Sequence, residues 1–236
     1  MKCLATHLLA VLLATPLGSL AAPLSAVLVG EYRPLKASET ELVTEGFEAS
    51  LLYRLGDALG REFALEEAGS VAPDLRLGAV SSGVVYYSSE AAALTSAQAG
   101  PESWSDLAGK AVCLEAGSPH DASMSRFGGL VRRYPSAAQA LIGLKLGECE
   151  AVVADRVLLE QIAQLPEWQR YSRLLPALEN SAVTLRLDAI DSALRKQIES
   201  VLAGEEGRAQ LAEVVQHWID EVAFQAYVLA DTLDCH

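Results

Sequence analysis

Apolar runs of strand length alternate along the chain with segments whose apolar residues recur at helical spacing. Ala26–Gly30 is a continuous apolar run, and Gly46–Leu59 then carries its leucines at helical spacing before Gly60. The same alternation predicts strands at Glu62–Leu65, Leu75–Val80, Val84–Tyr87, Ala111–Leu114, Cys149–Ala154 and Ser181–Leu187, and helices at Ser136–Gly147, Asp155–Leu165, Ile190–Leu202 and Arg208–Val222. Strands that alternate with helices through short loops form mainly parallel α/β sheets, because parallel neighbours need a crossover connection. The chain holds enough of these units for two sheets.

The charge balance excludes two classes of partner. The 236 residues carry 18 Lys and Arg against 31 Asp and Glu, a formal net charge of −13. Binding to nucleic acid needs clustered cations for the phosphates, and docking on anionic lipid headgroups needs them too. We therefore expect neither a nucleic-acid partner nor stable membrane insertion. Length and apolar content are those of a globular protein with one large domain or two small lobes.

The N-terminus has the order of a secretory signal peptide. Lys2 precedes the apolar run Leu8–Leu13, and small residues follow, with Ser19 and Ala21 at the −3 and −1 positions of a cut after Ala21. The apolar stretch is shorter than the ~20 residues of a membrane-spanning helix. We expect residues 1–21 to be a cleaved signal peptide and the mature chain, 22–236, to be exported to the periplasm.

Export to an oxidising compartment changes how the cysteines are interpreted. Cys113 and Cys149 each lie at a predicted strand, so a disulfide between them is geometrically feasible if the strands are neighbours, and buried free thiols are the alternative. Cys235 stands next to the last residue and is either free or intermolecular. No CxxC, HxxxH or His/Cys cluster occurs in the sequence, so we expect neither a metal site nor a cofactor.

The order of several short motifs resembles the family 3 extracellular solute-binding proteins, the amino-acid ABC transporter type. The motifs are Glu31–Leu35 after the first strand, Val84–Ser88, Trp104–Val112, Gly117-Ser118, and Lys145–Asp155. Their order and spacing cover nearly all of the mature chain. The resemblance implies the two-lobed type 2 periplasmic binding fold, in which each lobe is a mainly parallel sheet flanked by helices. Lobe 1 would be residues 22–95 plus 181–236, and lobe 2 residues 96–180, with a ligand trapped between them.

The resemblance also implies a set of ligand-binding residues. Asp155 would receive a ligand ammonium group, or would serve only as the N-cap of the following helix. Ser118 would hold a carboxylate, or would simply form a turn. Tyr32 would pack on the ligand, or on the core or surface. Ser81 and Ser82 follow a strand whose end contacts ligand in the family. His120 beside Asp121 is expected to be a solvated loop pair.

Two departures from the family concern the ligand. The arginine that clamps an amino-acid carboxylate has no counterpart, because Ser82-Gly83 leads almost directly into Val84 and Arg76 lies within the preceding strand. Glu115 replaces a residue that is often basic. An ordinary amino acid is therefore a doubtful ligand, and the alternatives are an amine, a neutral solute or no small molecule at all.

Three function classes follow from these patterns. The first is a solute-binding protein that captures a small polar molecule, without catalysis, for an ABC importer or a sensor. The second is a degenerate member of the family that works as an accessory protein through a periplasmic partner. The third is a dehydratase on the same scaffold, which we disfavour because its dicarboxylate substrates need cations and no catalytic residue set can be assembled.

Overall fold

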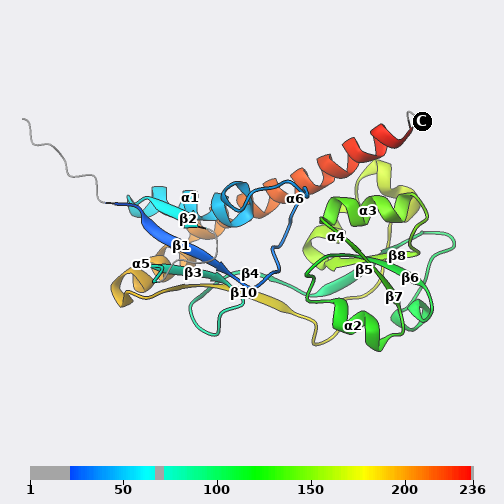
Figure 1. Ribbon diagram of the computed structural model, residues 1–236, viewed down its shortest axis with the longest axis horizontal. Helices are drawn as coiled ribbons and strands as arrows, with labels where there is room; N and C mark the ends of the chain where they lie inside the picture. The colour runs from blue at the N-terminus through cyan, green and yellow to red at the C-terminus, as the bar shows by residue number, and fades with distance from the viewer. Residues whose placement is uncertain (1–21, 67–71, 235–236) are drawn as a thin grey trace, which may run out of the picture.

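The computed structural model describes residues 22–66 and 72–234 and places two five-stranded sheets side by side (Figure 1). The first sheet has the order β2-β1-β3-β10-β4, from β1 (Leu24–Val29), β2 (Phe63–Glu66), β3 (Leu75–Gly78), β4 (Val84–Ser89) and β10 (Val183–Ala189). The second has the order β7-β6-β8-β5-β9, from β5 (Ala91–Thr95), β6 (Ala111–Glu115), β7 (Leu130–Tyr134), β8 (Ala151–Asp155) and β9 (Arg173–Leu174). The predicted signal peptide, 1–21, lies outside the described residues.

Helices flank both sheets. They are α1 (Phe47–Leu59), α2 (Asp121–Arg126), α3 (Ala137–Lys145), α4 (Arg156–Ile162), α5 (Ser192–Ala203) and α6 (Glu205–Asp234), with 3-10 turns η1 (Val43–Glu45), η2 (Trp104–Leu107) and η3 (Pro166–Tyr171). In α1 the residues at helical spacing that face the sheet, such as Leu51 and Leu55, are buried, as the sequence period predicts.

Each sheet is mixed, with one strand running against the other four. Within the first sheet β1 pairs in parallel with β2 and β3, whereas β10 is antiparallel to both of its neighbours. Within the second sheet β5 is the strand that opposes its neighbours. The reason is topological: β5 and β10 enter their lobes from the other lobe, while the remaining strands run toward it. The carboxyl ends of β1 and β8 therefore face each other.

The crossing between lobes lies at Glu90, between β4 and β5. Ala91–Thr95, which the sequence analysis assigned to lobe 1, pairs with β8 and β9 in the second sheet. The return crossing lies between β9 and β10. We accordingly propose lobe boundaries at Glu90 and near Ser181.

The longest helix, α6, extends beyond its predicted bounds of Arg208–Val222. It starts at Glu205, directly after α5, and runs to Asp234. A Cβ at Gly207 would lie 2.0 Å from the carbonyl oxygen of Val201, so glycine is what lets the first turn of α6 approach α5 this closely. Figure 1 shows α6 leaving the first lobe and ending over the second, where it packs on α3. The buried Ala226 explains why the helix continues past Val222.

One hydrophobic cluster runs through both lobes. It joins Leu77 of the first sheet, Leu141 of α3 and Val222 of α6, all of them buried. A second, smaller cluster lies on the α2 side of the second sheet and includes Leu114 and Met124. The lobes thus share a continuous core on the face that α6 covers.

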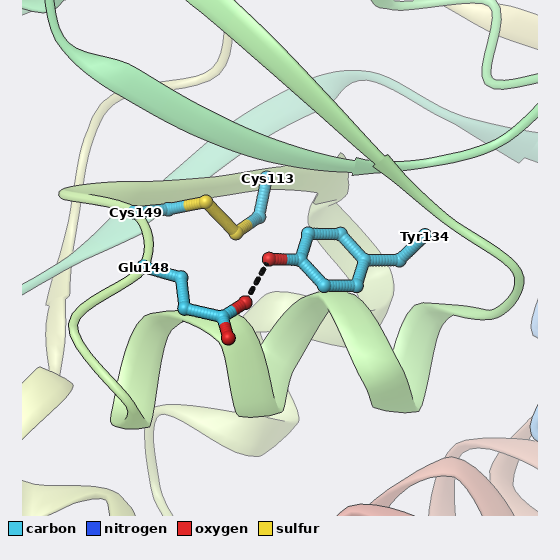
Figure 2. The surroundings of a disulfide bond; sticks show 4 residues. All are labelled: Cys113, Tyr134, Glu148 and Cys149. Carbon is cyan, nitrogen blue, oxygen red and sulfur yellow. Dashed lines mark hydrogen bonds between the residues drawn. A yellow bond between two sulfur atoms is a disulfide. The ribbon is translucent and has the colours of Figure 1, made fainter.

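A disulfide joins Cys113 of β6 to Cys149 just before β8, as the sequence allowed (Figure 2). The Cα atoms are 5.7 Å apart, and both side chains are buried. Beside the bridge the hydroxyl of Tyr134 donates to Glu148, as Figure 2 shows. A Cβ at Gly143 of α3 would lie 2.8 Å from the Cys113 sulfur, so the helix approaches the bridge only through glycine. Cys235 lies outside the described residues.

No helix among residues 22–66 and 72–234 combines the length and apolarity that a membrane crossing needs. No group of three or more His, Cys, Asp or Glu side chains is arranged there to hold a metal ion.

Candidate ligand-binding cleft

Asp155 stands at the carboxyl end of β8, at the edge of the second sheet that faces the first lobe. Its position is the N-cap of α4, but its side chain makes no capping hydrogen bond. Instead, the hydroxyl of Ser89 accepts from the backbone N–H of Val157, at 3.2 Å, and so satisfies the first turn of α4. The carboxylate is thereby left to point between the lobes, with only 3% of the residue exposed.

Three side chains surround this carboxylate, two of them from the opposite lobe. The hydroxyls of Tyr32, in the loop after β1, and Tyr87, on β4, both donate to Oδ2 of Asp155, the second at 2.5 Å. On the Oδ1 side, Nε2 of the buried His120 lies 2.9 Å away. Asp155 therefore bridges the lobes through the two tyrosines and is oriented within its own lobe by His120.

Burial sets the protonation of the groups around Asp155. The pKa values of Tyr32 and Tyr87 lie well above their ordinary range, first because of burial and second because of the Asp155 charge. Both hydroxyls therefore remain donors. The pKa of Glu115, at the end of β6, is also raised well above its usual value, mainly by burial and further by Asp155 and Glu41, against the lowering effect of Lys36 and Arg33.

The space among these side chains is small. A cavity of about 10 Å³ is lined by Tyr32, Leu35, Glu115, Ser118, His120, Ala137, Val153, Ala154, Asp155 and Leu158. Such a volume takes about one water molecule. A larger guest therefore requires the two lobes to move apart. None of the lining residues is a Lys or Arg.

The structure brings together three of the five residues predicted to bind ligand. Tyr32, Ser118 and Asp155 line the same cavity. Ser81 and Ser82 are exposed, and the Ser82 hydroxyl donates to Asp188 at 2.8 Å. Neither of these two serines lines the cavity, so a ligand role for them remains a prediction.

Two residues of the cluster were not assigned to it by the sequence analysis. The sequence assigned Tyr87 no ligand role, and the one signal for it was its place beside Tyr86 in the predicted strand Val84–Tyr87. The expectation for His120 as a solvated loop pair with Asp121 is wrong: His120 is buried against Asp155, while Asp121 pairs with Arg133 at 2.5 Å. In the turn before α2, the Ser118 hydroxyl accepts from the backbone N–H of His120, at 3.3 Å.

The missing arginine has no substitute in the cleft. Arg76 lies exposed on β3, as its place within a predicted strand implied. Arg33 is engaged by Glu41, at 3.1 Å, and the ammonium group of Lys36 donates to the carbonyl oxygen of Pro135, at 3.0 Å. The lining of the cleft therefore holds two carboxyl groups, those of Glu115 and Asp155, and no Lys or Arg.

Comparison with known proteins rests on structure alone, because no family model and no curated protein sequence matches the chain. The amino-acid ABC transporter substrate-binding protein AbpA from Streptococcus pneumoniae, bound to L-arginine, is 15% identical with a TM-score of 0.59, over 85% of this chain and 95% of that one. The GluR0 ligand-binding core from Nostoc punctiforme, in complex with L-glutamate, is 20% identical with a TM-score of 0.58, over 84% and 100% of the two chains.

A third neighbour is the arginine-, lysine-, histidine-binding protein ArtJ from Geobacillus stearothermophilus. It is 14% identical with a TM-score of 0.55, over 84% of this chain and 95% of that one. The chain has the two-lobed periplasmic binding protein fold. In this binding fold Asp155, Tyr32 and Tyr87 lie where the carboxyl ends of strands from both lobes meet, which is where α/β sheets place their ligands.

Proposed function

We propose that the mature chain is a non-catalytic, periplasmic solute-binding protein that captures a small cationic solute, such as an amine, between its lobes. The observation that carries this proposal is the buried Asp155 carboxylate at the lobe junction, with Glu115 beside it and no Lys or Arg in the lining. An ammonium group would meet a charge-assisted acceptor there, and the rings of Tyr32 and Tyr87 would add cation–π contacts.

Ligand entry would exchange one set of donors for another. An ammonium group would displace the tyrosine hydroxyls from Oδ2 of Asp155, while His120 would keep Oδ1 in place. The lobes would part to admit the solute and close on it again. Because the ligand competes with two internal hydrogen bonds, part of its binding free energy is used to replace them.

Ligand chemistry follows from what the lining lacks. AbpA is bound to L-arginine and the GluR0 core is in complex with L-glutamate. An amino acid also presents a carboxylate, which near Asp155 and Glu115 would face acids and no fixed cation. An amine without a carboxylate avoids this cost. Delivery to an ABC permease or to a membrane sensor is the proposed role of the loaded protein.

A second function is favoured by a different observation. The tyrosines and His120 already give Asp155 three hydrogen-bonding partners, and the remaining cavity is about 10 Å³. A cleft filled by its own side chains fits an accessory protein that keeps the fold and works through a protein partner instead of a solute.

The deciding measurement is thermal unfolding of residues 22–236 with primary amines, diamines, amino acids and organic acids. An amine held at 100 times its Kd is expected to add ~2.7 kcal/mol, which raises Tm by several degrees. Asp155→Asn should abolish the shift, whereas Asp121→Asn, which alters an exposed ion pair on the neighbouring helix, should preserve it. An amino acid that shifts Tm as much as the amines would contradict the ligand class. If no compound shifts Tm, the accessory function is the one that the result supports.

A further inference from the structure

The C-terminal half of α6 is apolar on two faces. On the inner face Val222 and Ala226 are completely buried in the shared core. On the outer face Phe224, Tyr227 and Val228 are 56%, 55% and 37% exposed. The exposed apolar side chains lie on the side of α6 opposite the buried ones, so packing on the shared core does not account for them. Two large aromatic rings that adjoin on one exposed turn are thus typical of a contact surface and not of a solvated helix face.

Acidic residues bracket this outer face. Asp220 and Asp231 are exposed and lie four positions before and seven positions after Phe224, on the same side of the helix. After Arg208 the described part of α6 contains no Lys or Arg. Negative charge near a helix C-terminus opposes the helix dipole, so Asp231 does not contribute to the stability of α6 itself.

We propose that this outer face, the α6 patch (Asp220, Phe224, Tyr227, Val228 and Asp231), docks an amphipathic helix of another protein whose apolar residues are flanked by Lys or Arg. The two aromatic side chains would be the anchors between the ridges of the partner helix. The flanking carboxylates would pair with the basic residues and fix the position of the partner along α6.

Charge argues against a second copy as the occupant. In an antiparallel twofold contact, Asp220 of one chain would face Asp231 of the other, and in a parallel contact each aspartate would face its own counterpart. Both arrangements place like charges together, in a protein whose net charge is already −13. A basic partner instead neutralises both ends of the patch.

The size of the patch sets the expected strength. One exposed turn with two aromatic anchors is smaller than a standard protein interface, so binding should be reversible, with a Kd on the order of micromolar. Such affinity suits a contact made and released in a crowded periplasm and not a permanent subunit.

The test is calorimetric titration of residues 22–236 with a synthetic amphipathic helical peptide that has a leucine face flanked by lysines. Phe224→Ala with Tyr227→Ala should weaken binding at least tenfold, and Asp220→Lys with Asp231→Lys should weaken it at least as much. The matched controls are Tyr53→Ala, which removes a 68% exposed tyrosine from α1, and Glu205→Lys with Glu206→Lys at the start of α6. Both controls should keep the affinity within twofold.

Each alternative outcome overturns the proposal. Equal losses in the patch variants and in the charge control would indicate general attraction of the peptide to an acidic surface. Absence of binding to a folded chain, checked by circular dichroism, would show that the patch is not a docking site for a basic helix. Analytical ultracentrifugation could instead reveal a dimer of the unaltered chain that dissociates when Phe224→Ala and Tyr227→Ala are introduced. That result would assign the patch to a second copy of the chain.

Discussion

Glu48 in the first turn of α1 shows, at the scale of one residue, what burial does to a carboxyl group. The residue is 2% exposed, and burial raises its pKa from 4.5 to about 7, against the lowering effect of Arg33. A proton is therefore taken up when the chain folds near neutral pH. The stabilising contribution is complete below pH 4.5 and is lost as the pH rises through about 7.

The raised pKa of Glu48 predicts how the stability of the protein changes with pH. The free energy of unfolding should fall between about pH 5 and pH 8, by up to roughly 3 kcal/mol from Glu48 alone, at about 1.4 kcal/mol per pH unit. Glu48→Gln should remove the share of the slope that comes from Glu48, while Glu115 and Glu41, whose pKa values are raised in the same direction, keep theirs. Urea unfolding from pH 5 to pH 8 measures the slope. Glu39→Gln, at an exposed position, should leave it unchanged, and a variant Glu48→Gln with the full slope would contradict the assignment.

Asp155 shows how context selects among the roles of one residue type. Its sequence position is that of a helix cap, yet the hydroxyl of Ser89 binds a first-turn N–H group of α4 and the carboxylate accepts from Tyr32 and Tyr87. Aspartate caps helices because its oxygens accept backbone N–H groups. The Asp155 carboxylate instead faces the hydroxyl groups of Tyr32 and Tyr87, which lie far from it in the sequence.

At the scale of elements, the disulfide ties β6 to the start of β8. The bridge closes a loop with a sequence separation of 36, which contains α2, β7 and α3. Because the loop is long, the cross-link removes much of its freedom in the unfolded chain. The second lobe therefore relies on a covalent link between two strands of its own sheet.

Removal of the bridge should lower stability without changing the fold. We expect Cys113→Ala with Cys149→Ala to lower the free energy of unfolding by about 2–4 kcal/mol. Urea unfolding of both chains, in a background that carries Cys235→Ser to prevent thiol exchange, gives the comparison. Since both cysteines are buried, dithiothreitol should reduce the bridge slowly in the folded protein and quickly in urea. Equal stability of the bridged and unbridged chains would show that the bridge adds nothing to the packed sheet.

At the scale of the whole molecule, three kinds of contact join the lobes. The tyrosine–Asp155 hydrogen bonds lie in the cleft, Lys36 reaches Pro135 beside it, and α6 lies across the outer face on a shared core. The cleft contacts can be exchanged for a ligand. The α6 contact cannot be exchanged in this way, because its separation would expose buried apolar side chains to water. Opening is therefore expected to be a small hinge motion about the face that α6 covers.

The cleft contacts can be tested by their removal. Tyr32→Phe with Tyr87→Phe deletes two hydrogen bonds to a charged group, each of which contributes about 1.5–3 kcal/mol. Double electron–electron resonance between spin labels at positions 53 and 130, one exposed in each lobe, measures the distance between the lobes. The distribution of that distance should be broader and longer in this variant. Tyr134→Phe is the matched control, because its hydroxyl bonds Glu148 within the second lobe. An unchanged distribution would mean that α6 alone holds the lobes together.

The sequence by itself determined the local features of this protein. Alternating apolar runs and helical periods predicted two α/β sheets, because backbone periodicity is a local property. The resemblance to solute-binding proteins implied a shared site for Tyr32, Ser118 and Asp155, and these three residues line one cavity. Only the tertiary structure decided which partners Asp155 takes, how far α6 extends and that Cys113 meets Cys149. Each of these depends on residues far apart in sequence, whose meeting is set by packing and not by any local pattern.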